Sequence, residues 1–250
     1  MIVLKTDLEI DEMKKAGHLA WELLEMVESH IKPGISTQDI NDLVEEYTKR
    51  RGGRSAPLAY KGFPKSVCTS VNQVVCHGIP SPKVILKEGD IINVDVTPIV
   101  NGYHGDSSRT FYVGNVSANA RKLVECSRKC LELGIEVVND RARVGDIGAV
   151  IQEYAESCGF QVVRDFVGHG IGKTFHEDPQ IPHYGIAGKG TRLTRGMVFT
   201  VEPMINEGDW RCKILSDGWT AVTVDNKLSA QFEHTIGIRS NGKVEIITAP

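Results

Sequence analysis

The chain has 250 residues, of which 41% are apolar and 24% charged, and its formal net charge is −3. These values are ordinary for a soluble globular protein, and a chain of this length buries enough surface to fold without disulfide staples. The acidic balance argues against broad electrostatic binding to nucleic acid, so direct nucleic-acid recognition is not expected.

The first half is predicted to contain two helices followed by strands. Charge appears at Lys5, so no signal peptide fits the N-terminal residues, and residues 7–31 then carry an apolar stripe at helical spacing. After Pro33-Gly34, Ser36 with Asp39 resembles a capping box that opens a second helix through about residue 51. Strands rich in Val, Ile, Thr and Phe are predicted over 90–100 and 103–113.

The second half repeats this order. Ser117 is placed to cap a helix that reaches about residue 139, and a shorter helix is predicted over 146–158. Strands are predicted over 196–206, 220–224 and 230–239. Helices that flank mostly antiparallel strands predict an α+β layered domain. No stretch approaches the roughly 20 apolar residues of a membrane span, so no membrane contact is expected.

An internal duplication explains the repeated order. Residues in two separate windows recur at one offset of 107: Asp39-Ile40, Glu46-Tyr47 and Gly52 match Asp146-Ile147, Glu153-Tyr154 and Gly159, and Leu86, Gly89 and Val94-Asp95 match Leu193, Gly196 and Val201-Glu202. We interpret residues 1–250 as a single domain built from two related halves, about 7–113 and 114–240, with approximate two-fold symmetry.

The six cysteines show neither paired C-x-x-C spacing nor the density of a disulfide scaffold. They are therefore expected to be reduced thiols, as in a cytoplasmic protein.

Two carboxylates follow one another across a predicted hairpin. Asn101-Gly102 is a strong signal for a type I′ turn, and a two-residue turn there would place Asp95 opposite Ser108. Asp95 and Asp106 would then be diagonal neighbours on one face, about 7–8 Å apart. Carboxylates at that distance can chelate a cation between them, although Pro98 and Gly105 leave room for a bulge in this register.

Three further candidate ligands lie in similar surroundings. Glu202 and Glu233 are acids inside apolar strand-like runs, and His169 stands in a glycine-rich segment that permits close backbone approach. One carboxylate in a strand is more often an edge residue facing water, but five such residues in two related settings argue against that interpretation. Four carboxylates and one neutral imidazole carry a formal charge of about −4, which two divalent cations would neutralise; oxygen-rich ligation suits Mn, Fe(II), Co or Zn.

Other motifs point less clearly to a function. His77 and His176 are lone histidines near glycine or proline, and on the residues alone a structural role is the simpler interpretation of each; His18, His30, His104, His183 and His234 are assigned to surface or structural positions. Gly172-Lys173-Thr174 resembles the end of a phosphate-binding loop, but Val167 stands where the first glycine would be required.

Taken together, these segments resemble the type I methionine aminopeptidases. The resemblance covers essentially the whole chain and rests on Asp95 with Asp106, Gly168-His-Gly-Ile-Gly172, Glu202-Pro203, Gln231-Phe-Glu-His234, Pro64-Lys-Ser-Val-Cys-Thr-Ser-Val-Asn72 and Val75-Cys-His-Gly-Ile-Pro80. It implies the two-fold pita-bread fold of creatinases and aminopeptidases. It also implies metal-dependent removal of the initiator methionine from new proteins whose second residue is small.

The resemblance implies a role for each candidate residue. Asp95 would chelate one of two divalent ions (Co, Mn, Fe(II), Zn or Ni), Asp106 and Glu233 would bridge the pair, and His169 and Glu202 would complete the second. His77 would contact the scissile amide nitrogen, His176 the scissile carbonyl, and Glu202 would carry the proton to the leaving amine. The residues implied around the methionine side chain are Tyr60, Phe63, Cys68, His77, Phe175, His176 and Trp219, and those implied around a monovalent cation are Asn72, Val74 and Ser229.

Two positions depart from the family pattern: many relatives carry Cys at Pro57 and Tyr at Phe63. The implied partners are N-termini of nascent polypeptides in the cytoplasm, with contact to the ribosome as a further hypothesis.

Two alternative functions remain open. One is a proline-specific aminopeptidase or prolidase of the same fold, whose members usually carry an added N-terminal domain. The other is a non-catalytic binding protein on the same scaffold, which would typically lack metal ligands.

Overall fold

The computed structural model describes residues 1–250 and contains four α-helices: α1 (Asp7–Glu28), α2 (Thr37–Arg50), α3 (Ala118–Glu136) and α4 (Val144–Ser157). The hydroxyls of Thr6, Ser36 and Ser117 accept backbone N–H groups at the starts of the first three helices. The caps predicted at Ser36 and Ser117 are therefore confirmed. The first and third helices end three residues earlier than predicted, and α4 begins two residues earlier.

The strands are antiparallel and form five small sheets. In sheet order they are β2 (Cys68–Val71), β4 (Ile91–Val96) and β7 (Ser107–Tyr112); β1 (Arg54–Ser55), β5 (Pro98–Val100) and β6 (Tyr103–His104); β13 (Cys212–Ile214), β14 (Ala221–Thr223) and β3 (Val74–Cys76); β10 (Glu177–Ile181), β9 (Gly168–Gly170), β11 (Val198–Val201), β16 (His234–Ile238) and β17 (Val244–Ile246); and β15 (Ser229–Gln231), β12 (Met204–Asn206) and β8 (Gln161–Val162). A short 3-10 turn, η1, spans Tyr60–Gly62.

The hairpin that carries the first two carboxylates has the predicted register. Asn101 and Gly102 both have left-handed backbone, with φ of 51° and 82°, as a type I′ turn requires. Asp95 pairs with Ser108 across β4 and β7, and the same register continues through β5 and β6. No bulge shifts it, because the Gly105 amide donates to the Pro98 carbonyl at 3.0 Å and keeps the two chains aligned.

Most of the long predicted strands are interrupted beside a candidate ligand. Residues 103–113 divide into β6 and β7 around Asp106, residues 196–206 into β11 and β12 around Glu202, and residues 230–239 into β15 and β16 around Glu233. At all three breaks the chain leaves one sheet and enters another. The prediction of continuous strands was wrong there, because the residues before and after each break take their hydrogen-bond partners from different sheets.

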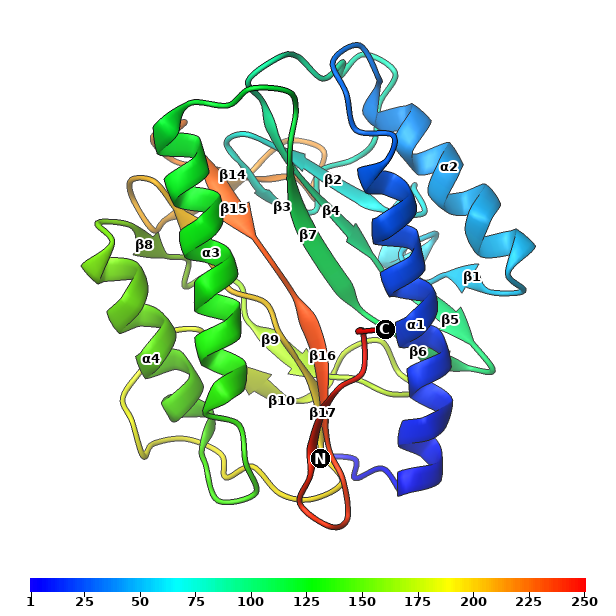
Figure 1. Cartoon of the computed structure of the whole chain (residues 1–250), viewed down its shortest axis with the longest axis vertical. Helices are drawn as coiled ribbons and strands as arrows, with labels where there is room; N and C mark the ends of the chain where they lie inside the picture. Colours follow the sequence, from blue (N-terminus) through cyan, green and yellow to red (C-terminus); the bar gives the residue numbers. More distant parts are fainter.

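The helices lie in two pairs that cover the outer side of the strands (Figure 1). One apolar cluster packs α1 and α2 onto β4 and β7, through residues such as Leu23, Ile40 and Phe111. A larger cluster packs α3 and α4 onto β11 and β15, through residues such as Leu123 and Ile151. The strands that carry the candidate ligands therefore run between the two pairs. None of the helices combines the length and apolar character needed to cross a membrane.

Gly105 allows α1 to approach the strand beside Asp106. A Cβ atom at this position would lie 2.4 Å from backbone atoms of Ala16 and Gly17. We expect Gly105→Ala to lower the free energy of unfolding by about 2 kcal/mol or more, because backbone atoms cannot yield as a side chain does. The measurement is urea denaturation. Gly52→Ala is the matched control: its φ is +75° and its surroundings are open, so about 1 kcal/mol is expected. Equal losses for the two variants would contradict the steric argument.

Candidate active site

One cavity of about 390 Å³ gathers nearly every residue singled out from the sequence. Its lining includes the five candidate ligands, both histidines of uncertain role and all the residues implied around a methionine side chain: Asp95, Asp106, His169, Glu202, Glu233, His77, His176, Tyr60, Phe63, Cys68, Phe175 and Trp219. Asn72, Val74 and Ser229 lie outside it.

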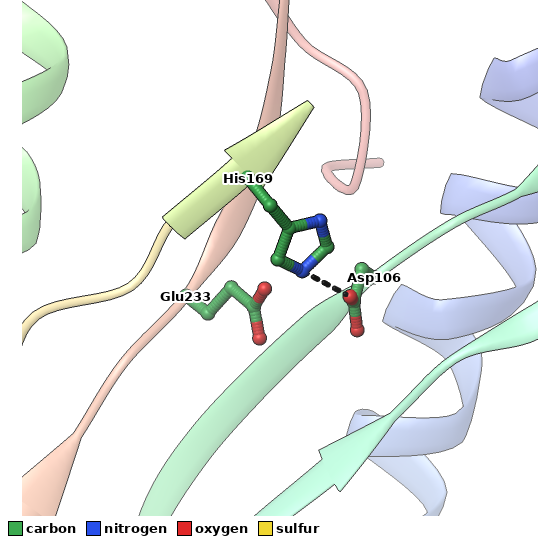
Figure 2. A group of neighbouring side chains, drawn as sticks. All are labelled: Asp106, His169 and Glu233. Carbon is green, nitrogen blue, oxygen red and sulfur yellow. Dashed lines mark ion pairs between the residues drawn. The ribbon is translucent and has the colours of Figure 1, made fainter. Parts of the chain in front are cut away.

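Three of the ligand candidates converge from different elements (Figure 2). Asp106 precedes β7, His169 stands in β9 and Glu233 precedes β16, and their ligand atoms all lie within 4.8 Å of one another. His169 Nε2 is 3.5 Å from Asp106 Oδ2 and 3.7 Å from Glu202 Oε1. Residues from both halves of the chain thus point into one small volume.

The electrostatics of this cluster require a positive partner. Burial raises the pKa of Asp95 to about 7, and burial followed by the charge of Asp95 raises the pKa of Glu202 to about 8. Burial and the neighbouring carboxylates also raise the pKa of Asp106 and of Glu233 well above their usual range. Burial lowers the pKa of His169 to about 4, so its imidazole is neutral and available as a ligand. Buried oxygen donors that repel one another, with one neutral nitrogen, fit divalent metal ions.

Polar side chains that the sequence analysis did not single out hold the carboxylates in place. The Thr97 hydroxyl donates to Asp106 Oδ1 at 2.7 Å, and the Thr200 hydroxyl donates to Glu202 Oε1 at 2.7 Å. Gln231 Nε2 donates to Glu202 Oε2 at 3.4 Å. Each contact fixes the direction of a ligand, as outer-shell partners do in metal sites. Gln231 lies two residues before Glu233 in the sequence. This proximity to a candidate ligand was the one feature of the sequence that could have indicated its role.

His183, which the sequence analysis assigned to a surface or structural position, has a structural role beside a candidate ligand. Its side chain is fully buried, and Nε2 accepts the backbone N–H of Glu202 at 3.0 Å. Burial lowers the pKa of His183 to about 3, so the ring stays neutral and keeps its acceptor. It therefore supports the segment that presents Glu202.

His176 lies at the centre of an aromatic cluster. Its ring is 4.1 Å from His169 and 4.3 Å from Phe175 between centroids, and the Tyr60 hydroxyl is 3.0 Å from Nδ1. Desolvation by the surrounding rings, followed by the charges of neighbouring imidazoles, lowers the pKa of His176 to about 3. In the tautomer in which Tyr60 donates to Nδ1, the proton of the neutral ring sits on Nε2, which is then a hydrogen-bond donor.

His77 also lines the cavity and has a left-handed backbone conformation, with φ of 56°. Such backbone is uncommon for a residue other than glycine and persists only when its surroundings over-determine it. The His77 ring meets Phe166 edge-on at 5.5 Å, and Trp219 meets Phe63 edge-on at 5.2 Å. Burial lowers the pKa of His77. These rings form an apolar wall next to the ligand cluster.

Replacement of His183 tests its support of Glu202. We expect His183→Leu to lower the free energy of unfolding by about 1–3 kcal/mol, because a buried N–H loses its acceptor. The affinity of the metal-free protein for Mn(II), measured by titration calorimetry, should decrease as well. His183→Gln retains an acceptor and should recover part of both losses. Undiminished Mn(II) affinity in His183→Leu would contradict the supporting role.

Metal removal tests the ligand cluster itself. After dialysis against a chelator, we expect Mn(II) or Co(II) at about 100 times its dissociation constant to stabilise the fold by about 2.7 kcal/mol, or roughly 5–10 °C in Tm. Asp106→Asn should abolish most of this shift in a thermal melt. Glu46→Gln makes the same change of charge on a side chain that is 70% exposed, and it should respond like the unmodified protein. A shift that survives Asp106→Asn would place the metal elsewhere.

Comparison with known proteins agrees with this geometry. The family model described as metallopeptidase family M24 matches residues 11–240. Methionine aminopeptidase A of Synechocystis is 61% identical over 99% of this chain and 97% of its own length. The crystal structure of methionine aminopeptidase from Rickettsia prowazekii superposes with a TM-score of 0.97 at 49% identity, covering 100% of both chains.

A more distant likeness separates fold from activity. Xaa-Pro dipeptidase from Bacillus anthracis superposes with a TM-score of 0.79 but is 24% identical, and the match covers 99% of this chain and 62% of that one. This likeness shows the fold alone. The predicted α+β pita-bread fold is thereby confirmed, and the high-identity relatives favour the aminopeptidase branch over the proline-specific one. The chain belongs to metallopeptidase family M24 and, within it, to the methionine aminopeptidases, which are metal-dependent hydrolases.

Proposed function

We propose that this chain removes the N-terminal methionine from peptides and nascent proteins whose second residue is small. The observation that carries the proposal is a single cavity in which a buried ligand cluster adjoins an aromatic wall. The 61% identity to a relative named methionine aminopeptidase A supports the same assignment. Residues 1–250 act as one catalytic domain, since the first half supplies Asp95 and Asp106 and the second supplies His169, Glu202 and Glu233.

We propose that the centre would hold two divalent ions of the group Co, Mn, Fe(II), Zn or Ni. The net charge of the donor set supports this number, because four carboxylates and a neutral imidazole require about four positive charges. In this centre Asp95 would hold one ion, Asp106 and Glu233 would be shared between the two, and His169 with Glu202 would hold the second. Ions bound here supply Lewis acidity toward a water molecule and toward the scissile carbonyl.

Three side chains handle protons and hydrogen bonds. The Nε2–H of neutral His176 donates to the scissile carbonyl oxygen, and Tyr60 holds the ring in that orientation. His77, which lines the same cavity, contacts the scissile amide nitrogen. Glu202, with its oxygens fixed by Thr200 and Gln231, carries a proton from the attacking water to the leaving amine.

The aromatic wall supplies the selectivity for methionine. A long, flexible and polarizable side chain gains favourable contacts against ring edges and a thiol. On the side of the cavity proposed for the methionine side chain, this wall includes the buried Phe63 and Cys68. The rings of Tyr60, His77, Phe175 and Trp219 complete it. Phe63 retains the ring of the tyrosine that many relatives carry but offers no hydroxyl, so this part of the slot is apolar.

A monovalent cation bound by Asn72, Val74 and Ser229 would brace the segment that leads to Glu233. Two features support this proposal. Asn72 has a left-handed φ of 52° and its carbonyl accepts the Ser229 amide at 2.9 Å. The Ser229 hydroxyl is buried and has no hydrogen-bond partner in the protein. A cation would take up these oxygens.

We place this activity in the cytoplasm, on nascent chains as they emerge from the ribosome. Removal of an initiator methionine requires a newly exposed N-terminus, which supports this location. Contact with the ribosome itself is a further proposal. A protein that does not sediment together with ribosomes would contradict it.

Hydrolysis of short peptides tests the function directly. We expect the metal-loaded protein to release methionine from Met-Ala-Ser and to leave Ala-Pro-Ala intact, because the slot fits a long apolar side chain. A chelator should stop the reaction, and adding Mn(II) or Co(II) should restore it. Asp106→Asn should lower kcat/KM by a factor of at least about 100, as loss of a bridging ligand disrupts both ions. Cleavage of Ala-Pro-Ala would indicate the proline-specific activity, and a folded, metal-loaded protein that cleaves neither would indicate a binding protein.

A further inference from the structure

The mouth of the cavity can be located from the few lining residues that are exposed to solvent. Of the residues that line it, three are exposed: Lys61, Asp165 and His176. The ligand cluster lies at the buried end, where Asp106 is 4% exposed and Glu233 is 2% exposed. If the N-terminal residue of a peptide occupies the buried end, the remainder of the peptide leaves past these exposed side chains. The Lys61 ammonium is 5.3 Å from the Tyr60 ring centroid, which is 5.2 Å from the His176 ring centroid, so Lys61 lies within about 11 Å of His176. An extended chain advances about 3.3 Å per residue, so the third to fifth residues of a peptide whose scissile carbonyl contacts His176 come within side-chain reach of Lys61.

The backbone that carries Lys61 is held in an unusual conformation. Ala59, Lys61 and Gly62 all have left-handed φ, at 66°, 47° and 90°. Such backbone costs about 1–2 kcal/mol at a residue with a Cβ atom. Hydrogen bonds from Ala59 N to Phe63 O and from Phe63 N to Tyr60 O, at 2.8 and 2.9 Å, hold the turn closed. The turn is also tied to the site through the Tyr60 hydroxyl and His176. Lys61 is therefore presented at the mouth by a constrained segment.

The mouth carries one cation, Lys61, and one anion, Asp165, and the two side chains do not form an ion pair with each other. The Lys61 ammonium lies over the Tyr60 ring, 5.3 Å from its centroid, and no carboxylate of the protein comes within ion-pair distance of it. The Asp165 carboxylate already accepts the Cys212 amide at 3.1 Å. One side of the Lys61 ammonium faces the Tyr60 ring, and the other side is open to solvent. An anionic group on the departing peptide is the natural counter-charge.

We propose that Lys61 forms a cationic subsite at the mouth of the cavity. This subsite binds acidic side chains in the third to fifth residues of the substrate. This inference rests on the proposed aminopeptidase function and adds a substrate preference to it. Peptides and nascent chains that carry Asp or Glu shortly after the small second residue are the substrates that this subsite favours. The ligand cluster and the aromatic wall select the first residue, and Lys61 acts beyond the second.

The test uses C-terminally amidated peptides, because a free terminal carboxylate would itself bind Lys61. The substrates are Met-Ala-Xaa-Ser-Gly, Met-Ala-Ser-Xaa-Gly and Met-Ala-Ser-Gly-Xaa amides, with Glu, Gln or Lys at Xaa. We expect the Mn(II)-loaded protein at low salt to show kcat/KM about two- to fivefold higher for Glu than for Gln in at least one series, mainly through KM. The ratio should fall toward one at about 0.5 M NaCl, where exposed charges are screened.

Variants assign the preference to one side chain. Lys61→Met should bring the Glu-to-Gln ratio to about one, Lys61→Arg should retain it, and Lys61→Glu should reverse it in favour of Lys peptides. Comparing ratios within each variant removes any change in overall activity. Lys87→Met, which removes an exposed lysine that does not line the cavity, should keep the original ratio.

The outcomes separate this inference from the function on which it rests. Release of methionine at equal rates from Glu and Gln peptides in every series would overturn the subsite while leaving the aminopeptidase activity in place. A preference that persists unchanged in Lys61→Met would overturn the assignment to Lys61. Failure to release methionine from the neutral Gln peptides would overturn the proposed function, and the subsite with it.

Discussion

Four carboxylates and one imidazole share a small buried volume between the two halves of the chain, and their repulsion is the constraint on which the site depends. Burial raises the pKa of each carboxyl group, and Asp95 and Asp106 raise the pKa of their neighbours further. A cluster of this kind is costly unless positive charge compensates it. The protein supplies no Lys or Arg to line the cavity beside the ligands, since the one lysine there, Lys61, is exposed at the mouth. Divalent metal ions fit this role, as the metallopeptidase family implies.

The rest of the fold is arranged to hold these groups in place. Strands change direction at Asp106, Glu202 and Glu233, so side chains from separate sheets meet at one point. The helix pairs cover the outer side of these strands, and the close approach of α1 at Gly105 fixes the segment beside Asp106. Hydroxyl, amide and imidazole groups from Thr97, Gln231 and His183 then orient individual ligands. Packing and polar contacts thus convert five separate residues into one centre.

Much of the local structure could be predicted because its causes are local. A side-chain cap at Ser36 and a type I′ turn at Asn101-Gly102 depend on a few neighbouring residues, and the turn sets the register that pairs Asp95 with Ser108. Strands such as β8 and β9 could not be predicted in this way. They are two and three residues long, too short to show alternation, and they are strands because a distant segment offers them hydrogen-bond partners.

The sequence by itself determined the helices, the hairpin register and the identity of the five candidate ligands. These follow from spacing, from turn chemistry and from the improbability of four unpaired acids and a histidine in apolar or glycine-rich segments. Tertiary structure decided which strands are interrupted, which histidines touch the site and where the mouth of the cavity lies. His183 shows the difference: its sequence neighbours give no sign of a contact with Glu202, which lies 19 residues away and is reached across the fold. Hydrogen bonds and burial between distant segments exist only after the chain has packed, so their consequences cannot be read from a local pattern.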